Sequence, residues 1–279
     1  MTTQLPTLGV GLGWREEIAS NILDHRRYVD WCELISDHFI NASEERLAAV
    51  RNISRTLPLI PHGLDLSIGS DAPPDDAYIN GLAVLVDAVR APWFTDHLCF
   101  TRGGGLNLGQ LGPLQFSEEV LEIVERNVRH LRSFIQIPFL LENISYDFVV
   151  PGGSMDEATF INETVRRADI GLLLDVTNVF TNAENHGFDA RAFIDRLPLD
   201  RVVQLHVAGG HQIDGRWVDS HSFPVPPQVL DLTDYVLQRA PVKAILLERD
   251  ANFPEAFAEL CDELGTLRQL MMRSGVALS

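Results

Sequence analysis

The segment from Val202 to Phe223 carries three histidines and two aspartates in a short length of chain. Such side chains are either scattered polar residues of the surface or part of a metal site, because imidazole and carboxylate groups together suit iron, zinc or manganese. Asp219 and His221 stand two residues apart, which places both side chains on one face of an extended segment. The segment therefore predicts a loop that carries metal ligands.

The same residue types follow a series of apolar runs along the chain. They stand at the ends of six consecutive predicted strands: His62, Asp96 with His97, Glu142 with Asn143, Asp175, His206 and Glu248. Several carboxylates brought together away from water would repel one another, whereas bound cations make that arrangement favourable. The ligands outnumber the needs of one ion, so two or three metal ions are expected. The absence of cysteine among them argues against a structural zinc cluster.

Eight apolar runs alternate with eight helical patterns. The runs span residues 8–14, 30–36, 57–63, 92–100, 137–143, 170–176, 201–207 and 242–250. The helical patterns span residues 15–29, 43–54, 74–89, 117–135, 155–168, 189–197, 226–240 and 254–272, and Ser43 is a predicted N-cap. Near-continuous apolar strands are typical of a parallel sheet that is covered on both faces.

Eight βα units in a chain of this length predict an α/β fold, a (β/α)8 TIM barrel that forms a single domain over residues 1–279. The polar strand ends would then meet at the C-terminal mouth of the barrel, where barrel enzymes place their chemistry. A doubly wound open sheet is the alternative. The early run GVGLG does not fit GxGxxG, so it gives little support to a dinucleotide site.

Composition and charge restrict the class of protein. Hydrophobic residues make up 46% of the chain and charged residues 22%, which is ordinary for a globular protein. No apolar run is long enough to span a membrane, and the N-terminal residues do not resemble a signal peptide. Three widely spaced cysteines suit reduced thiols, so a cytoplasmic location is expected. The net charge of −17 argues against a nucleic-acid partner.

Further polar residues are expected around the same mouth. Asp96, Asn143, His186 and His211 are predicted to contact the substrate or to support the ligands, with both histidines in loops. The glycine-rich segment 101–114 is predicted to be a mobile lid. Glu33, within the second apolar run, is interpreted as a strand residue whose hydrogen bonds are satisfied inside the fold.

Seven motifs together resemble a known family. They are PHGLDLSIGS, TDHLCF, LLENISY, LLLDVTNVFTNAENHGFD, LHVAGGH, VDSHSFPVP and LLERDANFP. In combination, and over nearly the whole chain, they are similar to the multinuclear non-haem iron-dependent oxidative enzymes. The xylose-isomerase-like barrels, which include the apurinic endonucleases, are more distant kin with ligands at equivalent strand ends.

The resemblance implies ligands for three ions. They are His62, His97 and Glu142 for the first, Glu142, Asp175, His206 and Glu248 for the second, and Asp219, His221 and Asn178 for the third. Glu142 would bridge two ions, and the four ligands of the second ion are the expected catalytic residues. Where the endonuclease-type barrels carry a histidine, this chain has Asn178, a weaker neutral donor. That departure argues against a hydrolytic trinuclear zinc centre.

The activity that the resemblance implies is the O2-dependent oxidation of a ribosomally made precursor peptide, most often at cysteine. The cofactor would be two or three iron ions that include a mixed-valent Fe(II)/Fe(III) pair, with the substrate thiolate on the ferric ion and O2 as co-substrate. A separate protein that binds the peptide leader is the implied partner. Two alternatives are a divalent-metal isomerase or phosphodiesterase of the wider superfamily, which would work without O2, and a non-catalytic metal carrier.

Overall fold

Eight parallel strands close into a barrel in the computed structural model, which describes residues 5–275. The strands are β1 (Gly9–Gly13), β2 (Trp31–Ile35), β3 (Leu59–His62), β4 (Phe94–His97), β7 (Phe139–Glu142), β8 (Gly171–Asp175), β9 (Val202–Ala208) and β12 (Ala244–Glu248). Each barrel strand pairs with the next barrel strand along the chain, and β12 pairs with β1 to close the ring. The predicted (β/α)8 barrel is confirmed.

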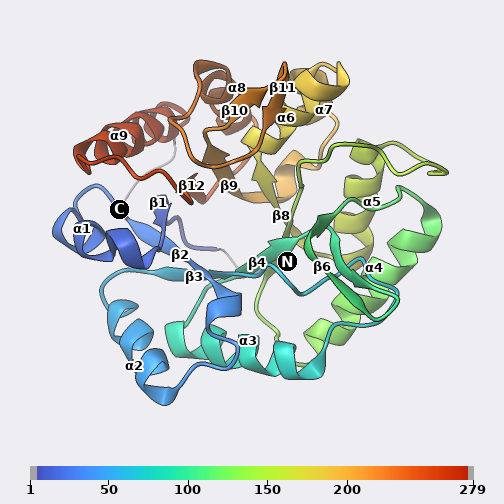
Figure 1. Cartoon of the computed structure of the whole chain (residues 1–279), viewed down its shortest axis with the longest axis horizontal. Helices are drawn as coiled ribbons and strands as arrows, with labels where there is room; N and C mark the ends of the chain where they lie inside the picture. The colour runs from blue at the N-terminus through green and yellow to red at the C-terminus, as the bar shows by residue number, and fades with distance from the viewer. Residues whose placement is uncertain (1–4, 276–279) are drawn as a thin grey trace.

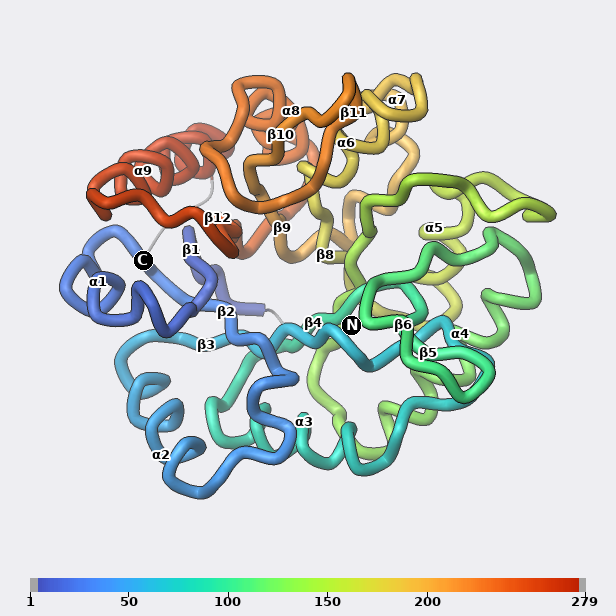
Figure 2. Tube along the Cα trace, in the orientation of Figure 1, coloured from blue at the N-terminus to red at the C-terminus, as the bar shows by residue number. Residues whose placement is uncertain are grey.

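Helices surround the ring of strands (Figures 1 and 2). They are α1 (Ala19–Asp24), α2 (Glu44–Ile53), α3 (Asp76–Val89), α4 (Glu118–Arg132), α5 (Glu157–Ala168), α6 (Val176–His186), α7 (Ala190–Ile194), α8 (Pro227–Leu237) and α9 (Ala258–Arg273). Short 3-10 helices occupy Glu16–Ile18, Ser36–His38 and Leu199–Arg201. Ser43 caps α2, since its hydroxyl accepts a hydrogen bond from the amide of Arg46 as predicted.

Helix α6 differs from the prediction, which placed a helix only at residues 189–197 after β8. In the structure α6 begins at Val176, directly after β8, and the short α7 follows it. Asparagines and β-branched residues give this segment a low intrinsic helix propensity. Burial of Val176, Val179 and Phe180 against the barrel overrides that preference. His186 is therefore the last residue of α6 and does not lie in a loop.

Two antiparallel hairpins rise from loops of the barrel. The glycine-rich segment forms β5 (Phe100–Gly103) and β6 (Leu106–Gly112), and the segment after β9 forms β10 (His211–Ile213) and β11 (Arg216–Val218). Gly104 and Gly105 both have positive φ, as a two-residue hairpin turn requires. The lid predicted at 101–114 is thus largely a paired hairpin, because two glycines in sequence favour a tight turn between short strands.

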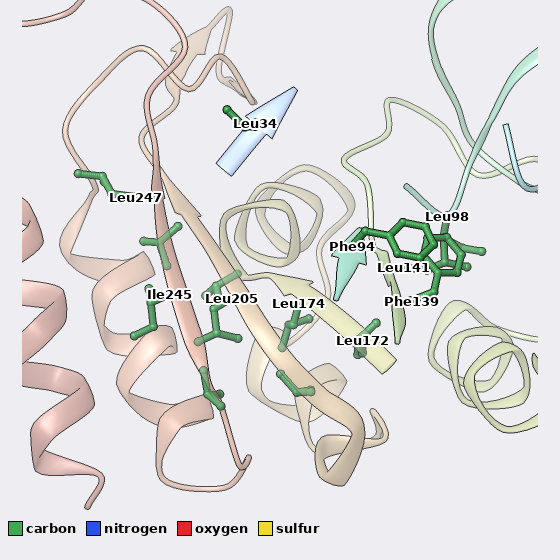
Figure 3. Packing of buried hydrophobic residues seen from close by; sticks show 14 of the residues in the cluster. Leu34, Phe94, Leu98, Phe139, Leu141, Leu172, Leu174, Leu205, Ile245 and Leu247 are labelled. Atoms are coloured by element: carbon green, nitrogen blue, oxygen red, sulfur yellow. The ribbon is translucent and has the colours of Figure 1, made fainter. Parts of the chain in front are cut away.

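The strands present different side chains to the two sides of the barrel wall. Leu172, Leu174, Leu205, Ile245 and Leu247 face outward and pack in the core cluster that includes the helices (Figure 3). Successive strand residues alternate between the two faces. This alternation leaves every second residue to fill the interior of the barrel.

The interior of the barrel has an apolar floor below a polar layer. Trp31, Ile60, Leu140, Leu173 and Leu246 belong to the floor, a separate buried cluster drawn from the strands. Two residues further along the same strands stand Glu33, His62, Glu142, Asp175 and Glu248, which are all buried. The two-residue period thus turns a sequence pattern into a layer of ionisable groups at the C-terminal mouth.

Close packing inside the barrel leaves little room near β1. A Cβ atom added to Gly11 would lie 2.5 Å from the indole of Trp31, so only glycine fits beside that ring.

The cysteines Cys32, Cys99 and Cys261 are buried and unpaired. Among the described residues, no helix combines the length and the apolar character that a membrane crossing needs.

Candidate metal centre

Glu142, at the end of β7, stands between two sets of candidate ligands. Its Oε2 atom lies 3.5 Å from Nε2 of His62 and 3.5 Å from Nε2 of His97. Its Oε1 atom lies 3.2 Å from Nδ1 of His206. Ligand atoms that share an ion at about 2.1 Å each are separated by about 3 to 3.5 Å. If two ions were bound, each oxygen of Glu142 would face one of them.

The first group, His62, His97 and Glu142, is buried and offers two imidazoles and a carboxylate. Nδ1 of His97 donates to the carbonyl of Gly63 at 3.1 Å, which leaves the Nε2 lone pair toward Glu142. Nδ1 of His62 is 2.7 Å from the hydroxyl of Thr95. Burial, with the neighbouring imidazole of His97, holds the pKa of His62 well below its ordinary value. His62 is thus neutral near pH 7, as a metal ligand must be.

The second group consists of Glu142, Asp175, His206 and Glu248, whose ligand atoms lie within 4.8 Å of one another. Burial, followed by the charges of Glu142 and Asp219, holds the pKa of Asp175 well above its ordinary value. Burial disfavours the charged form of His206, but the carboxylates of Glu142, Glu33 and Glu248 outweigh it and hold its pKa well above the usual range. Without a cation this group retains protons, which a bound metal would displace.

The third group contains His221, Glu248 and Asp250, so of the ligands predicted for a third ion it includes His221 but not Asp219 or Asn178. Nδ1 of His221 is 3.1 Å from Oδ2 of Asp250, and its Nε2 is 2.8 Å from Oδ1 of Asp219. His221 has a φ of 48°, a left-handed conformation that is uncommon for a residue with a side chain. Nδ2 of Asn178 donates to the carbonyl of Asn143 at 3.0 Å, so its Oδ1 atom is left as a free acceptor.

Unpaired buried atoms test whether metal ions fit this mouth. Buried side-chain atoms that make no hydrogen bond include Glu142 Oε2, Asp175 Oδ2, Asn178 Oδ1, His206 Nδ1, Asp219 Oδ1, His221 Nε2 and Glu248 Oε2. Buried polar atoms in proteins are nearly always paired. Here the unpaired atoms belong to candidate ligands from four strands, the first turn of α6 and the loop after β11, which meet at one mouth. Mixed nitrogen and oxygen donors of this kind fit iron, and also zinc or manganese.

The residues predicted to contact substrate or to support ligands lie around the three groups. Asn143 uses both ends of its amide on the backbone of Asp175, donating to its carbonyl and accepting from its amide. Asp96 is fully buried, and burial together with the charge of Asp37 holds its pKa well above the ordinary value. His186 contacts the carbonyl of Tyr146 through Nε2 at 2.9 Å.

His211 lies in β10, on the hairpin that precedes Asp219. Its Nδ1 atom is 3.0 Å from the hydroxyl of Ser220, and its ring packs against Phe223. The loop placement predicted for it is therefore replaced by a short strand. None of Asp96, Asn143, His186 and His211 belongs to the three metal-compatible groups.

Three residues at the centre were not predicted as parts of it. Asp250 follows Glu248 by two positions in LLERD, a spacing that could have revealed it. Glu33 contacts Nε2 of His206 at 3.0 Å, and Gln204 contacts Glu33 at 2.7 Å. Their roles depend on contacts across the barrel, which spacing along one strand does not reveal.

A cavity of about 390 Å³ lies beside the mouth. Its lining includes the aromatic side chains of Phe116, Tyr146, Phe188 and Phe193. Tyr146 follows Ser145, whose hydroxyl donates to Oδ2 of Asp219 at 3.2 Å. One loop after β7 therefore forms a wall of the cavity and also contacts a candidate ligand.

The sequence of residues 9–272 matches the family described as RiPP precursor modification enzyme MbnB/TglH/ChrH. A RiPP is a ribosomally synthesised and post-translationally modified peptide. The chain belongs to this family. The resemblance to the multinuclear non-haem iron-dependent oxidative enzymes that the motifs predicted is thereby confirmed, and the family implies a peptide substrate.

Curated relatives of this family member cover most of its length. A UPF0276 protein of Streptomyces avermitilis is 36% identical over 279 residues, 97% of this chain and 56% of the relative. A UPF0276 protein of Anaeromyxobacter sp. is 37% identical over 88% of this chain and 87% of its own length. A UPF0276 protein of Rhizorhabdus wittichii is 36% identical over 93% of this chain and 94% of its own length. The chain thus spans only about half the length of the Streptomyces relative.

Solved structures similar to this family member are xylose-isomerase-like barrels. The 3-keto-D-glucoside 4-epimerase of E. coli has a TM-score of 0.56 and 16% identity, covering 94% of this chain and 99% of its own. A putative xylose isomerase from Rhodospirillum rubrum has a TM-score of 0.57 and 15% identity, covering 98% and 100%. At these identities the likeness establishes the fold alone.

Proposed function

We propose that this protein is an iron- and O2-dependent oxidase that modifies a ribosomally made precursor peptide, with cysteine as the target side chain. Its cofactor would be two or three iron ions in a mixed Fe(II)/Fe(III) state, with dioxygen as co-substrate. The observation that carries the proposal is the set of buried, unpaired ligand atoms at the barrel mouth, in a chain of a precursor-modifying family.

The proposed ligand assignment keeps the first two groups and the ligands that the sequence predicted for a third ion. The first ion would bind His62, His97 and Glu142, and the second would bind Glu142, Asp175, His206 and Glu248. The third would bind Asp219, His221 and Asn178, of which only His221 belongs to the third group of the structure. Asp250 is added as the partner of His221 Nδ1. Asn178 is a neutral donor, so we propose the third ion as the weakest bound.

In the proposed reaction the protein holds the ligands in fixed positions, supplies their negative charge and excludes water from the centre. Bound iron would supply the electrons that reduce O2 and the positive charge that favours a substrate thiolate. Glu142 and Asp175 are 2% and 0% exposed, so the floor of the centre excludes water from all but the open mouth. Carboxylates held in a dry site interact strongly with cations, and their fixed positions need no rearrangement during the reaction.

The aromatic cavity beside the mouth supports a peptide substrate. Phe148 and Val149, on the same loop as Tyr146, are adjacent and 60% and 53% exposed, so they add apolar surface to this loop, and Val149 also lines the cavity. We propose that an apolar side chain near the modified cysteine binds here while the cysteine reaches the metal centre. A separate protein that binds the peptide leader would hold the rest of the precursor.

The decisive experiment measures metal and activity together. Protein from an iron-supplied culture is assayed for iron content and Mössbauer spectrum, then incubated with short cysteine-containing peptides encoded near its gene. We expect two to three irons per chain with a coupled mixed-valent pair, and a peptide mass change that needs O2. Glu142→Gln should lose at least one iron and lower the modification rate by at least 100-fold, because the bridging carboxylate is lost.

The matched control is Glu122→Gln, which removes an exposed carboxylate on α4 and should leave iron content and activity unchanged. Full activity in Glu142→Gln would contradict the proposed centre. Anaerobic activity on a sugar with zinc or manganese, and no iron-dependent signal after anaerobic reconstitution, would instead support a divalent-metal isomerase.

A further inference from the structure

A chain of four buried side chains crosses the interior of the barrel beneath the metal centre. Nε1 of Trp93 donates to Oε1 of Gln204 at 2.8 Å, and Nε2 of Gln204 donates to Oε2 of Glu33 at 2.7 Å. Nε2 of His206 lies 3.0 Å from that same oxygen. Trp93, Gln204 and His206 are 0% exposed and Glu33 is 4% exposed. The chain thus links the apolar floor to a candidate ligand.

The direction of each hydrogen bond follows from the chemistry of the indole. The indole N–H can only donate, so the Gln204 atom that faces Trp93 must be its oxygen. The amide nitrogen of Gln204 then faces Glu33 and donates to it, and this nitrogen also lies 3.1 Å from Nε2 of His206. The Glu33 oxygen is therefore an acceptor, and when Nδ1 binds a metal, Nε2 of His206 carries the proton that this oxygen accepts.

The other nitrogen of His206 points into the second metal group. Nδ1 is 3.0 Å from Oε2 of Glu248 and 3.2 Å from Oε1 of Glu142. It makes no hydrogen bond in the structure. We propose that Glu33, held by Gln204 and Trp93, is a positioning residue that fixes Nδ1 of His206 as the metal-binding nitrogen. This inference rests on the metal centre of the proposed function.

The histidines of the first group lack such a partner. His97 donates to the carbonyl of Gly63, and His62 contacts the hydroxyl of Thr95, so both have neutral partners. A carboxylate partner makes an imidazole a stronger donor than a carbonyl or hydroxyl partner does. Glu33 therefore acts on the second group and not on the first. Replacing Glu33 should leave metal binding by the first group unchanged.

Two variants separate the carboxylate from the packing. Glu33→Gln keeps the size of the side chain and removes its charge, so Nε2 of His206 is left without a carboxylate partner. The exchange Glu33→Gln with Gln204→Glu moves the carboxylate to position 204, where the side-chain amide nitrogen lies 3.1 Å from Nε2 of His206 in the native chain. The exchange variant therefore keeps a carboxylate partner for that nitrogen. Glu33→Gln should lose metal affinity, and the exchange variant should regain most of it.

The first readout is the affinity of the metal-free protein for Fe(II), measured anaerobically by competition with a chelator. We expect the affinity for one Fe(II) per chain to fall by about 10- to 100-fold in Glu33→Gln, the range found for loss of the partners of metal-bound histidines, and to return toward the wild-type value in the exchange variant. The affinity of the remaining Fe(II) should be unchanged. Thr233→Val, which removes a buried hydroxyl bonded only to Val229 of its own helix, is the control and should bind as the wild type does.

The second readout reports the hydrogen bond itself. In protein loaded with Zn(II) as a diamagnetic probe and labelled with 15N-histidine, Nε2–H of His206 should give a downfield, slowly exchanging proton signal. The signal should move upfield in Glu33→Gln, and stay near its wild-type position in the exchange variant and in Thr233→Val. A merely structural role for Glu33 would change stability without moving this signal.

The outcomes of the two proposals are distinguishable. If the wild type binds neither Fe(II) nor Zn(II), the metal centre of the proposed function fails. If the wild type binds both, and Glu33→Gln has the same affinity and the same Nε2–H signal, the inference on Glu33 is overturned. Should Glu33→Gln fail to fold, Gln204→Met tests the same chain, because it keeps the length of the side chain and removes the amide that donates to Glu33. It should weaken the binding of one Fe(II) by several-fold, and unchanged affinity and signal would overturn the inference.

Discussion

Asn143 bonds twice to the backbone of Asp175, at 3.0 Å to its carbonyl and 2.9 Å from its amide. Both residues are buried, so no water can replace these bonds. The Asn143 amide therefore fixes the backbone of Asp175, while the amide of Asn178 holds its carboxylate oxygen Oδ1. Asn143, which follows Glu142 in LLENISY, therefore supports the candidate centre by holding Asp175 of the neighbouring strand β8.

We predict that Asn143→Ala lowers the free energy of unfolding by about 2–4 kcal/mol, because two buried backbone groups lose their partners. It should also weaken metal binding by displacing Asp175. Urea denaturation of the metal-free protein and an iron titration measure the two effects. Asn162→Ala is the control, since Asn162 makes a similar pair of amide bonds near the surface, where water can replace them. Equal losses in the two variants would argue against a special role for Asn143.

At the scale of the element, the first turn of α5 holds a carboxyl with an unusual environment. Glu157 accepts a hydrogen bond from the hydroxyl of Tyr146 at 2.8 Å and lines the aromatic cavity, with Asp156, Asp189 and Arg196 around it. Burial raises the pKa of Glu157 to about 7, against the hydrogen bond from Tyr146. The folded protein therefore holds a proton between the ordinary pKa of 4.5 and about 7 that the unfolded chain releases.

The contribution of this proton to stability is complete below pH 4.5 and is lost as the pH rises through 7. We predict that Glu157→Gln is more stable than the wild type at pH 8 by about 2 kcal/mol, allowing for screening of a half-buried group, and about equal to it near pH 4.5. Urea denaturation at both pH values measures the difference. Glu163→Gln, on the same helix, should give no stabilisation at pH 8, since Glu163 pairs with Arg166 and Arg167. An identical pH profile for Glu157→Gln and wild type would contradict the assignment.

At the scale of the whole molecule, the fold brings ionisable side chains together inside the barrel, where burial makes their charged forms unfavourable. Asp175, His206 and His221 all keep protons in the metal-free site: burial and carboxylate neighbours raise the pKa of Asp175, and carboxylates outweigh burial for the two histidines. As the pH rises through these raised values, the metal-free protein loses the stability that the protons provide. Metal binding replaces the protons, so its stabilising effect should grow with pH.

We predict that a chelator-treated protein gains about 5 °C in Tm on adding Fe(II) at 100 times its Kd, at pH 8. The gain should be smaller at pH 6, because metal then competes with protons for the same atoms. Anaerobic thermal unfolding with and without Fe(II) at the two pH values provides the measurement. Glu122→Gln should behave as the wild type does. A gain that is equal at both pH values, or larger at pH 6, would show that the raised pKa values do not govern metal binding.

The sequence by itself determined the architecture and the place of the centre. Apolar runs that end in histidine or carboxylate, as at His62, Glu142 and Glu248, predict both the strands and the mouth, because neighbouring parallel strands in a barrel all end on one side. The pattern failed at α6, where buried contacts of Val176 and Phe180 prevail over a low helix propensity. It also failed at the two hairpins, whose pairing depends on tight turns between strands too short to show a pattern.

Only the tertiary structure decided which atom of each side chain is free to bind. Glu33 and His206 are 173 residues apart, and Trp93 and Gln204 are 111 apart, yet their hydrogen bonds leave Nδ1 of His206 as the free nitrogen. Asp250 reaches His221 across the ends of different loops in the same way. The face of the strand that each residue occupies can be predicted from the sequence, because strand side chains alternate with a period of two. The hydrogen bonds cannot be predicted in this way, because they depend on the distances that barrel closure sets between strands far apart in sequence.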